Sequence, residues 1–200
     1  MASVKVRIGP TDNGRRMSLA DFIDAEEVAG YRYELARGVI EVVEVPNDPH
    51  AQIIDNLHQE FANFRQQNPC PILRVAHGSD VQLIIPEWES ERHPDLAVIF
   101  RETEPNARDR RMPRLVVEVV SAGREARDRD YLTKSEEYLT FGIEEYWIVD
   151  PQLKQVSVLY REGELATWSE HVFAGDELIV SRILIGLAIS VSSLWVDVDG

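Results

Sequence analysis

The chain has 200 residues, of which 44 % are hydrophobic, enough to bury a sizeable core in one domain. Its formal net charge of −14 disfavours non-specific binding to nucleic acids and to anionic membranes. The single cysteine, Cys70, excludes an internal disulfide and a cysteine-based zinc site.

No apolar run at the start of the chain resembles a signal peptide, and the longest apolar stretch, residues 183–191, is about half as long as a bilayer-spanning helix. We therefore expect a cytoplasmic protein with no membrane partner.

The first elements predicted are a short helix and a hairpin. Residues 1–17 are polar and contain glycine, which indicates a loose arm or an edge strand. Ser18 is a suitable N-cap for a short helix over the next residues. A hairpin is predicted over residues 33–43 with Gly38 in its turn, and Glu34 would be a surface acid on it. We expect residues 18–200 to form a single domain.

A long amphipathic helix is predicted from the Asn-Asp-Pro-His segment at residues 47–50 to about Asn68. Asp48 would cap it, and proline is tolerated in the first turn. His50 lies in that turn, where the helix dipole favours the neutral imidazole that can bind a metal. The simpler alternative is a partly exposed histidine of the capping region.

The rest of the chain alternates strands and one further helix. The predicted strands are residues 72–76, 80–85, 94–100, 115–120, 145–150, 155–161, 164–173 and 187–191. Residues 101–113 form a charged loop, and 124–141 read as a helix with Tyr131, Leu132, Tyr138 and Leu139 facing inward. The order predicts an α/β fold with a mixed central β-sheet flanked by helices.

Two acids in apolar strands are the main candidates for chemistry. Asp95 precedes the Leu-Ala-Val-Ile-Phe run, and Glu118 lies inside Leu-Val-Val-Glu-Val-Val. A buried carboxylate is costly unless it is paired or bound to a metal. For a single acid, an arginine salt bridge is the more common explanation. Two such acids favour a site for a hard cation such as Mg²⁺, which takes oxygen ligands.

Lys134 follows on the next helix, four residues after Asp130, an order that is typical of an ordinary surface ion pair. The functional alternative is that the helix returns Lys134 to the two carboxylates. Basic residues also concentrate in this part of the chain. They are Arg108, Arg110, Arg111, Arg114, Arg124, Arg127, Arg129 and Lys134. A solvated stretch balanced by Glu125, Asp128 and Asp130 is favoured over a patch that faces phosphates.

These motifs together resemble the Uma-two-like restriction endonuclease family of the PD-(D/E)XK nuclease superfamily. The residues that carry the resemblance are YELARG at 33–38, His50, Pro94-Asp95, VEVVS at 117–121, Asp130, Lys134 and GIEEYWIVDP at 142–151. The resemblance covers residues 18–195, and its last block is the most diagnostic one.

The resemblance implies a restriction-endonuclease-like fold that holds Mg²⁺ or Mn²⁺ and acts on DNA, in a homodimer. Asp95 and Glu118 would bind the metal, helped by the Val119 carbonyl, with Glu34 and His50 lining the pocket and Lys134 as the catalytic lysine. The chain departs from the superfamily's Glu-x-Lys pattern, because residue 120 is valine. Residues two apart face the same side of a strand, so Lys134 would fill the gap that Val120 leaves beside Glu118.

Two alternatives to a nuclease stay open. The chain could be a binding or regulatory module that keeps the fold with little or no catalysis, as its negative charge favours. It could also present an acidic surface to a basic protein partner, with the carboxylates incidental.

Overall fold

The computed structural model describes residues 5–43, 47–67, 70–106, 109–163 and 166–198. The chain groups into two compact units, Met1–Pro46 with Gln82–His93, and Asn47–Val81 with Pro94–Gly200. We refer to them as the first unit and the second unit. A single domain over residues 18–200 remains a prediction.

The first unit is built on a four-stranded antiparallel sheet in the order β4-β3-β7-β6. Its strands are β3 (Arg32–Ala36), β4 (Val39–Val43), β6 (Leu83–Ile85) and β7 (Ser90–Arg92). The predicted β3–β4 hairpin is confirmed, with Arg37 and Gly38 at φ 51° and 74° in its turn. Glycine adopts such a φ without strain.

The remaining elements of the first unit precede this sheet. Strand β1 (Arg7–Ile8) pairs in parallel with β2 (Glu26–Glu27), and helix α1 (Leu19–Asp24) lies between them in sequence. The predicted Ser18 cap is confirmed, because its hydroxyl accepts a hydrogen bond from the Asp21 amide. Ile8 is fully buried with the core residues Phe22 and Leu35, so residues 7–8 match the predicted edge strand and not the loose arm.

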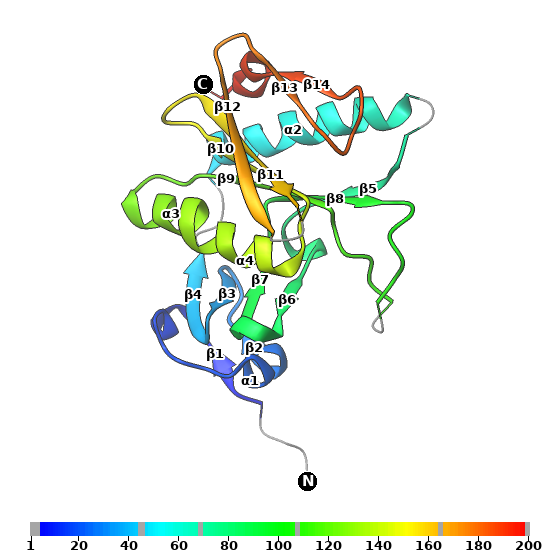
Figure 1. Cartoon of the computed structure of the whole chain (residues 1–200). Helices are drawn as coiled ribbons and strands as arrows, with labels where there is room; N and C mark the ends of the chain where they lie inside the picture. Colours follow the sequence, from blue (N-terminus) through cyan, green and yellow to red (C-terminus); the bar gives the residue numbers. More distant parts are fainter. Residues whose placement is uncertain (1–4, 44–46, 68–69, 107–108, 164–165, 199–200) are drawn as a thin grey trace. The chain divides into compact units, whose positions relative to one another are not determined.

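The second unit contains a six-stranded mixed sheet in the order β12-β11-β10-β9-β8-β5 (Figure 1). In sequence order its strands are β5 (Ile72–Ala76), β8 (Leu96–Phe100), β9 (Leu115–Val119), β10 (Glu145–Asp150), β11 (Gln155–Glu162) and β12 (Thr167–Ala174). Strands β9 and β10 are parallel, and all the other pairs are antiparallel. The prediction of an α/β fold with a mixed sheet is confirmed.

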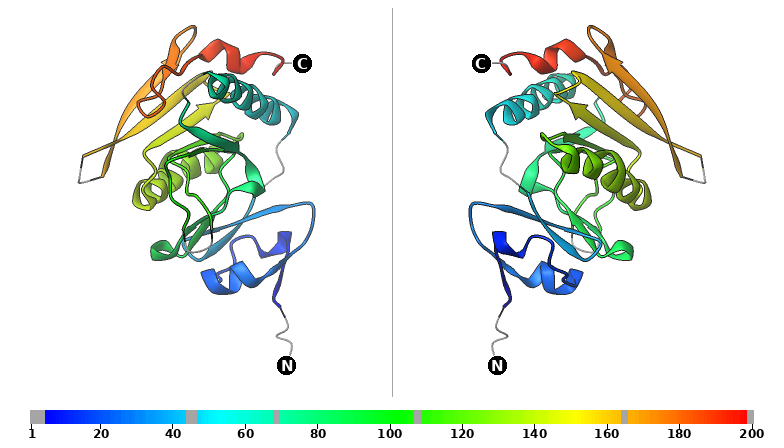
Figure 2. Two further views of the ribbon diagram at one scale, coloured as in Figure 1. Left: turned by 90° about the vertical axis from the view of Figure 1, so that its right-hand side faces the viewer. Right: turned by 90° about the vertical axis from the view of Figure 1, so that its left-hand side faces the viewer.

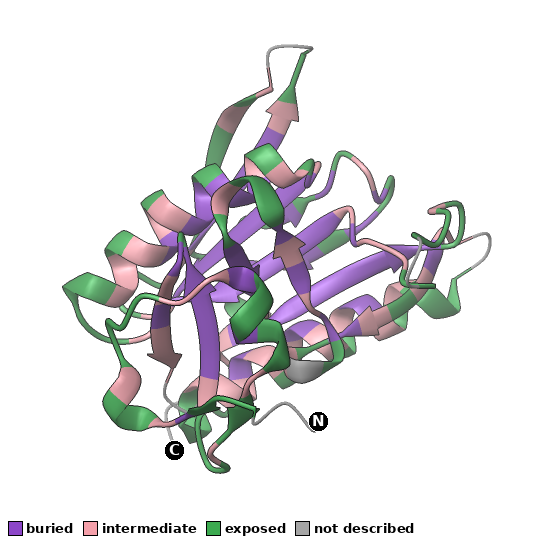
Figure 3. Cartoon of the chain, turned by 90° about the horizontal axis from the view of Figure 1, so that it is seen from below, coloured by how far each residue is buried: buried purple, intermediate pink, exposed green. Residues whose placement is uncertain are grey.

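Helices cover both faces of this sheet (Figure 2). One face carries α2 (Asp48–Gln66), and the other carries α3 (Arg124–Asp128), the π-helical turn η4 (Arg129–Thr133) and α4 (Lys134–Phe141). Strands β8, β9 and β10 are buried along their whole length, as expected for strands covered on both sides (Figure 3).

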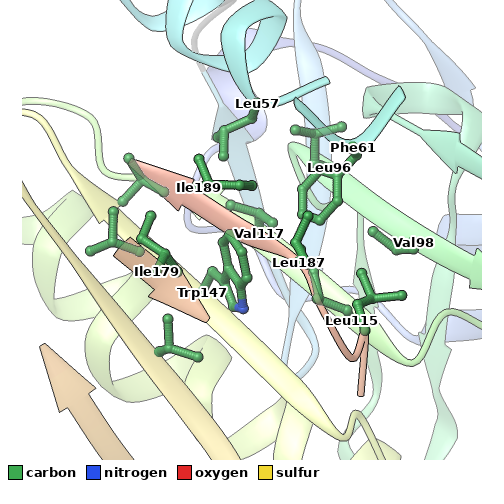
Figure 4. Close-up of a cluster of buried hydrophobic side chains, with 14 of the residues drawn as sticks. Leu57, Phe61, Leu96, Val98, Leu115, Val117, Trp147, Ile179, Leu187 and Ile189 are labelled. Carbon is green, nitrogen blue, oxygen red and sulfur yellow. The ribbon is translucent and has the colours of Figure 1, made fainter. Parts of the chain in front are cut away.

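The main hydrophobic core lies between the sheet and α2 (Figure 4). Leu57 and Phe61 of α2 pack with Val117 and Trp147, the residues of β9 and β10 that face this helix. The core also takes in a C-terminal hairpin of β13 (Leu178–Val180) and β14 (Ala188–Ser190), which the 3₁₀ helix η5 (Val191–Trp195) follows. Side chains alternate along a strand, so Glu118 lies on the opposite face, towards α4.

Several details differ from the sequence predictions. Asn47, not Asp48, caps α2, because its side chain accepts the His50 amide at 3.1 Å. Leu132 is 62 % exposed rather than inward, since η4 turns Asp130 and Lys134 towards the sheet. Short strands β2, β7 and β13 were not predicted, and most predicted ends shift by a few residues. Predicted positions 68 and 164–165 lie outside the described residues.

None of the helices in the described part of the chain has the length and apolar character that crossing a bilayer requires.

Candidate active site

In the second unit, Asp95 directly precedes β8, and Glu118 lies on the neighbouring antiparallel strand β9. The β8–β9 register pairs Leu96 with Val117, and continuing it by one residue sets Asp95 opposite Glu118. Directly opposite residues of an antiparallel pair project from the same face of the sheet. Both residues are almost completely removed from solvent: 7 % of the surface of Asp95 and 3 % of that of Glu118 are exposed. The sheet thus brings together the two acids that the sequence singled out.

The Asp95 carboxylate is held by one side chain and one backbone amide. Its Oδ2 lies 3.2 Å from His50 Nε2 and accepts a hydrogen bond of 2.9 Å from the Val119 N–H. Burial acts to raise the pKa of Asp95, but these two donors and the Lys134 charge outweigh it and lower that pKa below its ordinary value. Asp95 is therefore kept ionised although it is buried. His50 is not merely an exposed residue of the helix cap.

Glu118 is held by two donors from helix α4. Its Oε1 accepts a hydrogen bond of 2.9 Å from Lys134 Nζ and another from the Tyr138 hydroxyl. Lys134 and Tyr138 are four residues apart, one helical turn, so both reach the same oxygen. The contact between Lys134 and Glu118 matches the expected return of the lysine to the acids. Sequence reasoning placed Tyr138 only in the core, although its spacing from Lys134 was a signal for this contact.

Asp130 is a third buried acid beside this pair. It is 1 % exposed and Lys134 is 3 % exposed, so the ion pair between them lies in the interior and not at the surface. Asp130 Oδ1 lies 3.1 Å from Arg129 Nε and 3.9 Å from Lys134 Nζ. Burial raises the pKa of Asp130 above its ordinary value, against the opposing effect of the two cations. The sequence could not show that η4 turns this residue inward.

Glu34 lies in the first unit and is not a surface acid. It is 1 % exposed, and its two carboxylate oxygens accept hydrogen bonds from Arg92 Nη1 at 3.0 Å and from the His93 amide at 3.1 Å. The hairpin position was misleading because β7, which brings Arg92 to β3, was not predicted. That Glu34 belongs to the same site as Asp95 remains a prediction.

The basic stretch is largely paired with acids. Arg124 contacts Asp128, Arg127 contacts Asp150, and Arg114 contacts both Glu102 and Glu144. Arg129 and Lys134 are paired within the site, and Arg108 lies outside the described residues. These pairs agree with the simpler interpretation of a charge-balanced stretch.

The amino-acid sequence also matches a known protein family. Residues 19–192 match the family Uma2, which is described as "Putative restriction endonuclease". The chain belongs to the Uma2 family. No protein with a curated description matches it.

A solved structure extends the comparison to the fold of this Uma2 chain. The crystal structure of a "putative nuclease belonging to DUF820" from Anabaena variabilis superposes with a TM-score of 0.70. The match covers 90 % of this chain and 97 % of that one at 17 % sequence identity. The fold is therefore shared with a nuclease-like protein, and the expected restriction-endonuclease-like architecture is confirmed.

The donor set of this Uma2 chain suits a hard cation better than zinc. Among the described residues, no group of three or more His, Cys, Asp or Glu side chains converges to form a ready metal cage. Mg²⁺ does not require one, because it usually binds one or two carboxylates and completes its shell with water and substrate oxygens. The Asp95–Glu118 pair, with Asp95 kept ionised, fits that requirement.

Proposed function

We propose that this chain is a divalent-metal-dependent endonuclease that hydrolyses phosphodiester bonds in DNA. Membership of the Uma2 family supports nuclease activity, and restriction-endonuclease-like proteins generally use divalent metals. The observation that carries the rest is the pair of buried carboxylates, Asp95 directly before β8 and Glu118 on β9, with the Lys134 ammonium 2.9 Å from Glu118.

In this proposal each residue has one role. Asp95 and Glu118 hold Mg²⁺ or Mn²⁺, helped by the Val119 carbonyl, and His50 orients Asp95 from the start of α2. The bound ion supplies a Lewis acid for the phosphate and for the attacking water. Lys134 orients that water and offsets charge that develops on the phosphate. Glu34 takes part in catalysis, and the active form is a homodimer, as expected for cleavage of two strands.

A second function is supported by the charges. The net charge is −14, and arginines of the basic stretch are paired with acids, as Arg124 is with Asp128 and Arg127 with Asp150. This chain therefore offers little general attraction to DNA. A binding or regulatory module with weak or no catalysis would have the same fold and the same charge distribution.

Cation binding separates the two functions. We expect Mg²⁺ and Mn²⁺ to raise the melting temperature of the wild type, because a ligand that binds only the folded state stabilises it, by about 2.7 kcal/mol at a hundred times its Kd. Asp95→Asn should remove this increase. Asp150→Asn is the matched control, since Asp150 is also a buried acid, at the end of β10, but lies outside the proposed site.

A cleavage assay then tests the reaction itself. The wild type should nick plasmid DNA in the presence of Mn²⁺. The variants Asp95→Ala, Glu118→Ala and Lys134→Ala should each lack this activity. Cleavage that survives loss of both carboxylates would refute the nuclease site. Absence of any response to cations in the wild type would favour the binding module.

A further inference from the structure

Asp130 lies at a turn of unusual geometry beside the proposed site. In η4 the Lys134 amide donates to the Arg129 carbonyl, five residues earlier, instead of four as in an α-helix. Such π-helical turns are rare and occur frequently at functional sites. The Tyr146 hydroxyl donates a 2.9 Å hydrogen bond to the Asp130 carbonyl and so fixes the turn against β10.

The Asp130 carboxylate is held on one side only. Oδ1 accepts from Arg129 at 3.1 Å, whereas Oδ2 is buried and has no hydrogen-bond partner in the described part of the chain. A buried carboxylate oxygen without a donor is costly. An acid that only stabilised the fold would be expected to have both oxygens satisfied, so a donor is missing from this arrangement.

Lys134 is a second donor close to Asp130. Its Nζ lies 2.9 Å from Glu118 Oε1 and 3.9 Å from Asp130 Oδ1. A small movement of the ammonium group would therefore transfer it from Glu118 to Asp130. The ammonium carries three protons on a flexible stem and can change acceptor without a change in the backbone. A divalent cation on Glu118 would repel the ammonium at that short distance.

We propose that Asp130 is a positioning residue that receives the Lys134 ammonium when Glu118 binds the metal ion. This inference rests on the proposed function, because it requires a cation at Glu118. Before binding, Lys134 neutralises Glu118. After binding, Lys134 pairs with Asp130, which satisfies the buried acid and keeps the lysine beside the phosphate. Asp130 thereby reduces the cost of displacing the lysine and strengthens metal binding.

A double-mutant cycle on Mn²⁺ affinity tests the proposal without any use of nuclease activity. The proteins are the wild type, Asp130→Asn, Lys134→Met and the double variant, titrated with Mn²⁺ in a calorimeter. Asp130→Asn should weaken binding by about fivefold or more, the lower end of typical coupling between linked groups. In the Lys134→Met background the same change should alter affinity by less than about twofold, because no lysine remains to be received.

Three outcomes would count against the proposal. If Asp130→Asn weakens binding equally in both backgrounds, Asp130 acts only through its charge. If it changes affinity in neither, Asp130 is structural. If the wild type binds no Mn²⁺, the proposed function fails and this inference fails with it.

A direct measurement covers the case in which Lys134→Met does not fold. In a crystal structure of the wild type with Mn²⁺, Lys134 Nζ should lie within hydrogen-bond distance of an Asp130 oxygen and no longer of Glu118. A lysine that stays on Glu118 with the ion bound would overturn the proposal.

Discussion

The buried Glu118 carboxylate depends on the hydroxyl of Tyr138. Tyr138 is fully buried, and its ring packs edge-on against Tyr146 with 5.0 Å between centroids. Tyr138→Phe keeps this packing and removes one donor to Glu118. We expect it to lower the free energy of unfolding by about 1.5–3 kcal/mol, the usual contribution of a hydrogen bond to a charged group. Urea denaturation measures the loss.

Tyr160→Phe is the matched control for this prediction. The Tyr160 hydroxyl donates at 2.8 Å to the Val180 carbonyl, a neutral acceptor, so its loss should cost only about 0.5–1.5 kcal/mol. Equal losses of unfolding free energy in the two variants would mean that the hydrogen bond from Tyr138 to Glu118 contributes no more than one to a neutral acceptor.

The contact of Lys134 with Glu118 was one of two alternatives that the residue types left open, and the family resemblance favoured it. An acid inside an apolar strand and a lysine on the next helix are each recognisable locally, and strand pairing set the second acid opposite the first. Tyr138 was assigned only to the core and Asp130 to the surface. Their contacts with Glu118 and Lys134 depend on how the helix is rotated about its axis. The π-helical turn that sets this rotation has no local sequence signal. Glu34 was misplaced because its partner, Arg92, is 58 residues away.

At the scale of elements, the start of α2 sets the position of His50. The Asn47 side chain accepts the His50 amide, which holds the first turn of the helix and the imidazole beside Asp95. Asn47→Ala should lower the free energy of unfolding by about 1 kcal/mol, the typical cost of losing an N-cap. Asn47→Ser should stay close to the wild type, because serine caps nearly as well. Thermal or urea unfolding of both variants measures the difference.

Asp48 provides the contrary case. It lies at the first helical position and does not supply the cap, so Asp48→Ala should cost less than Asn47→Ala. The opposite order would restore the cap that the sequence predicted. Two adjacent residues of capping type cannot be separated by pattern, because the backbone conformation decides which of them stands outside the helix.

At the scale of the whole molecule, the mixed sheet was predictable but its order and the two units were not. Apolar runs such as β9 and β10 reveal buried strands, and their parallel pairing follows from the helix between them. Strand β7 has three residues, too few to show a period. The pairing of β7 with β3 joins Leu35 to Glu91, residues far apart in the sequence, which no local pattern encodes.

This connectivity predicts that the units unfold together. The chain passes between them three times, after residues 46, 81 and 93, and residues 82–93 complete the first unit's sheet from within the sequence of the second. Leu35 of the first unit and Leu57 of the second are both fully buried. Leu35→Ala and Leu57→Ala should therefore each shift one common unfolding transition, with a loss of about 2–5 kcal/mol in the free energy of unfolding.

The exposed Leu153 provides the control, and Leu153→Ala should have almost no effect on this transition. Calorimetry measures the shift, since a single transition gives equal calorimetric and van't Hoff enthalpies. Two transitions, each moved by only one of the core variants, would instead divide residues 18–200 into two domains.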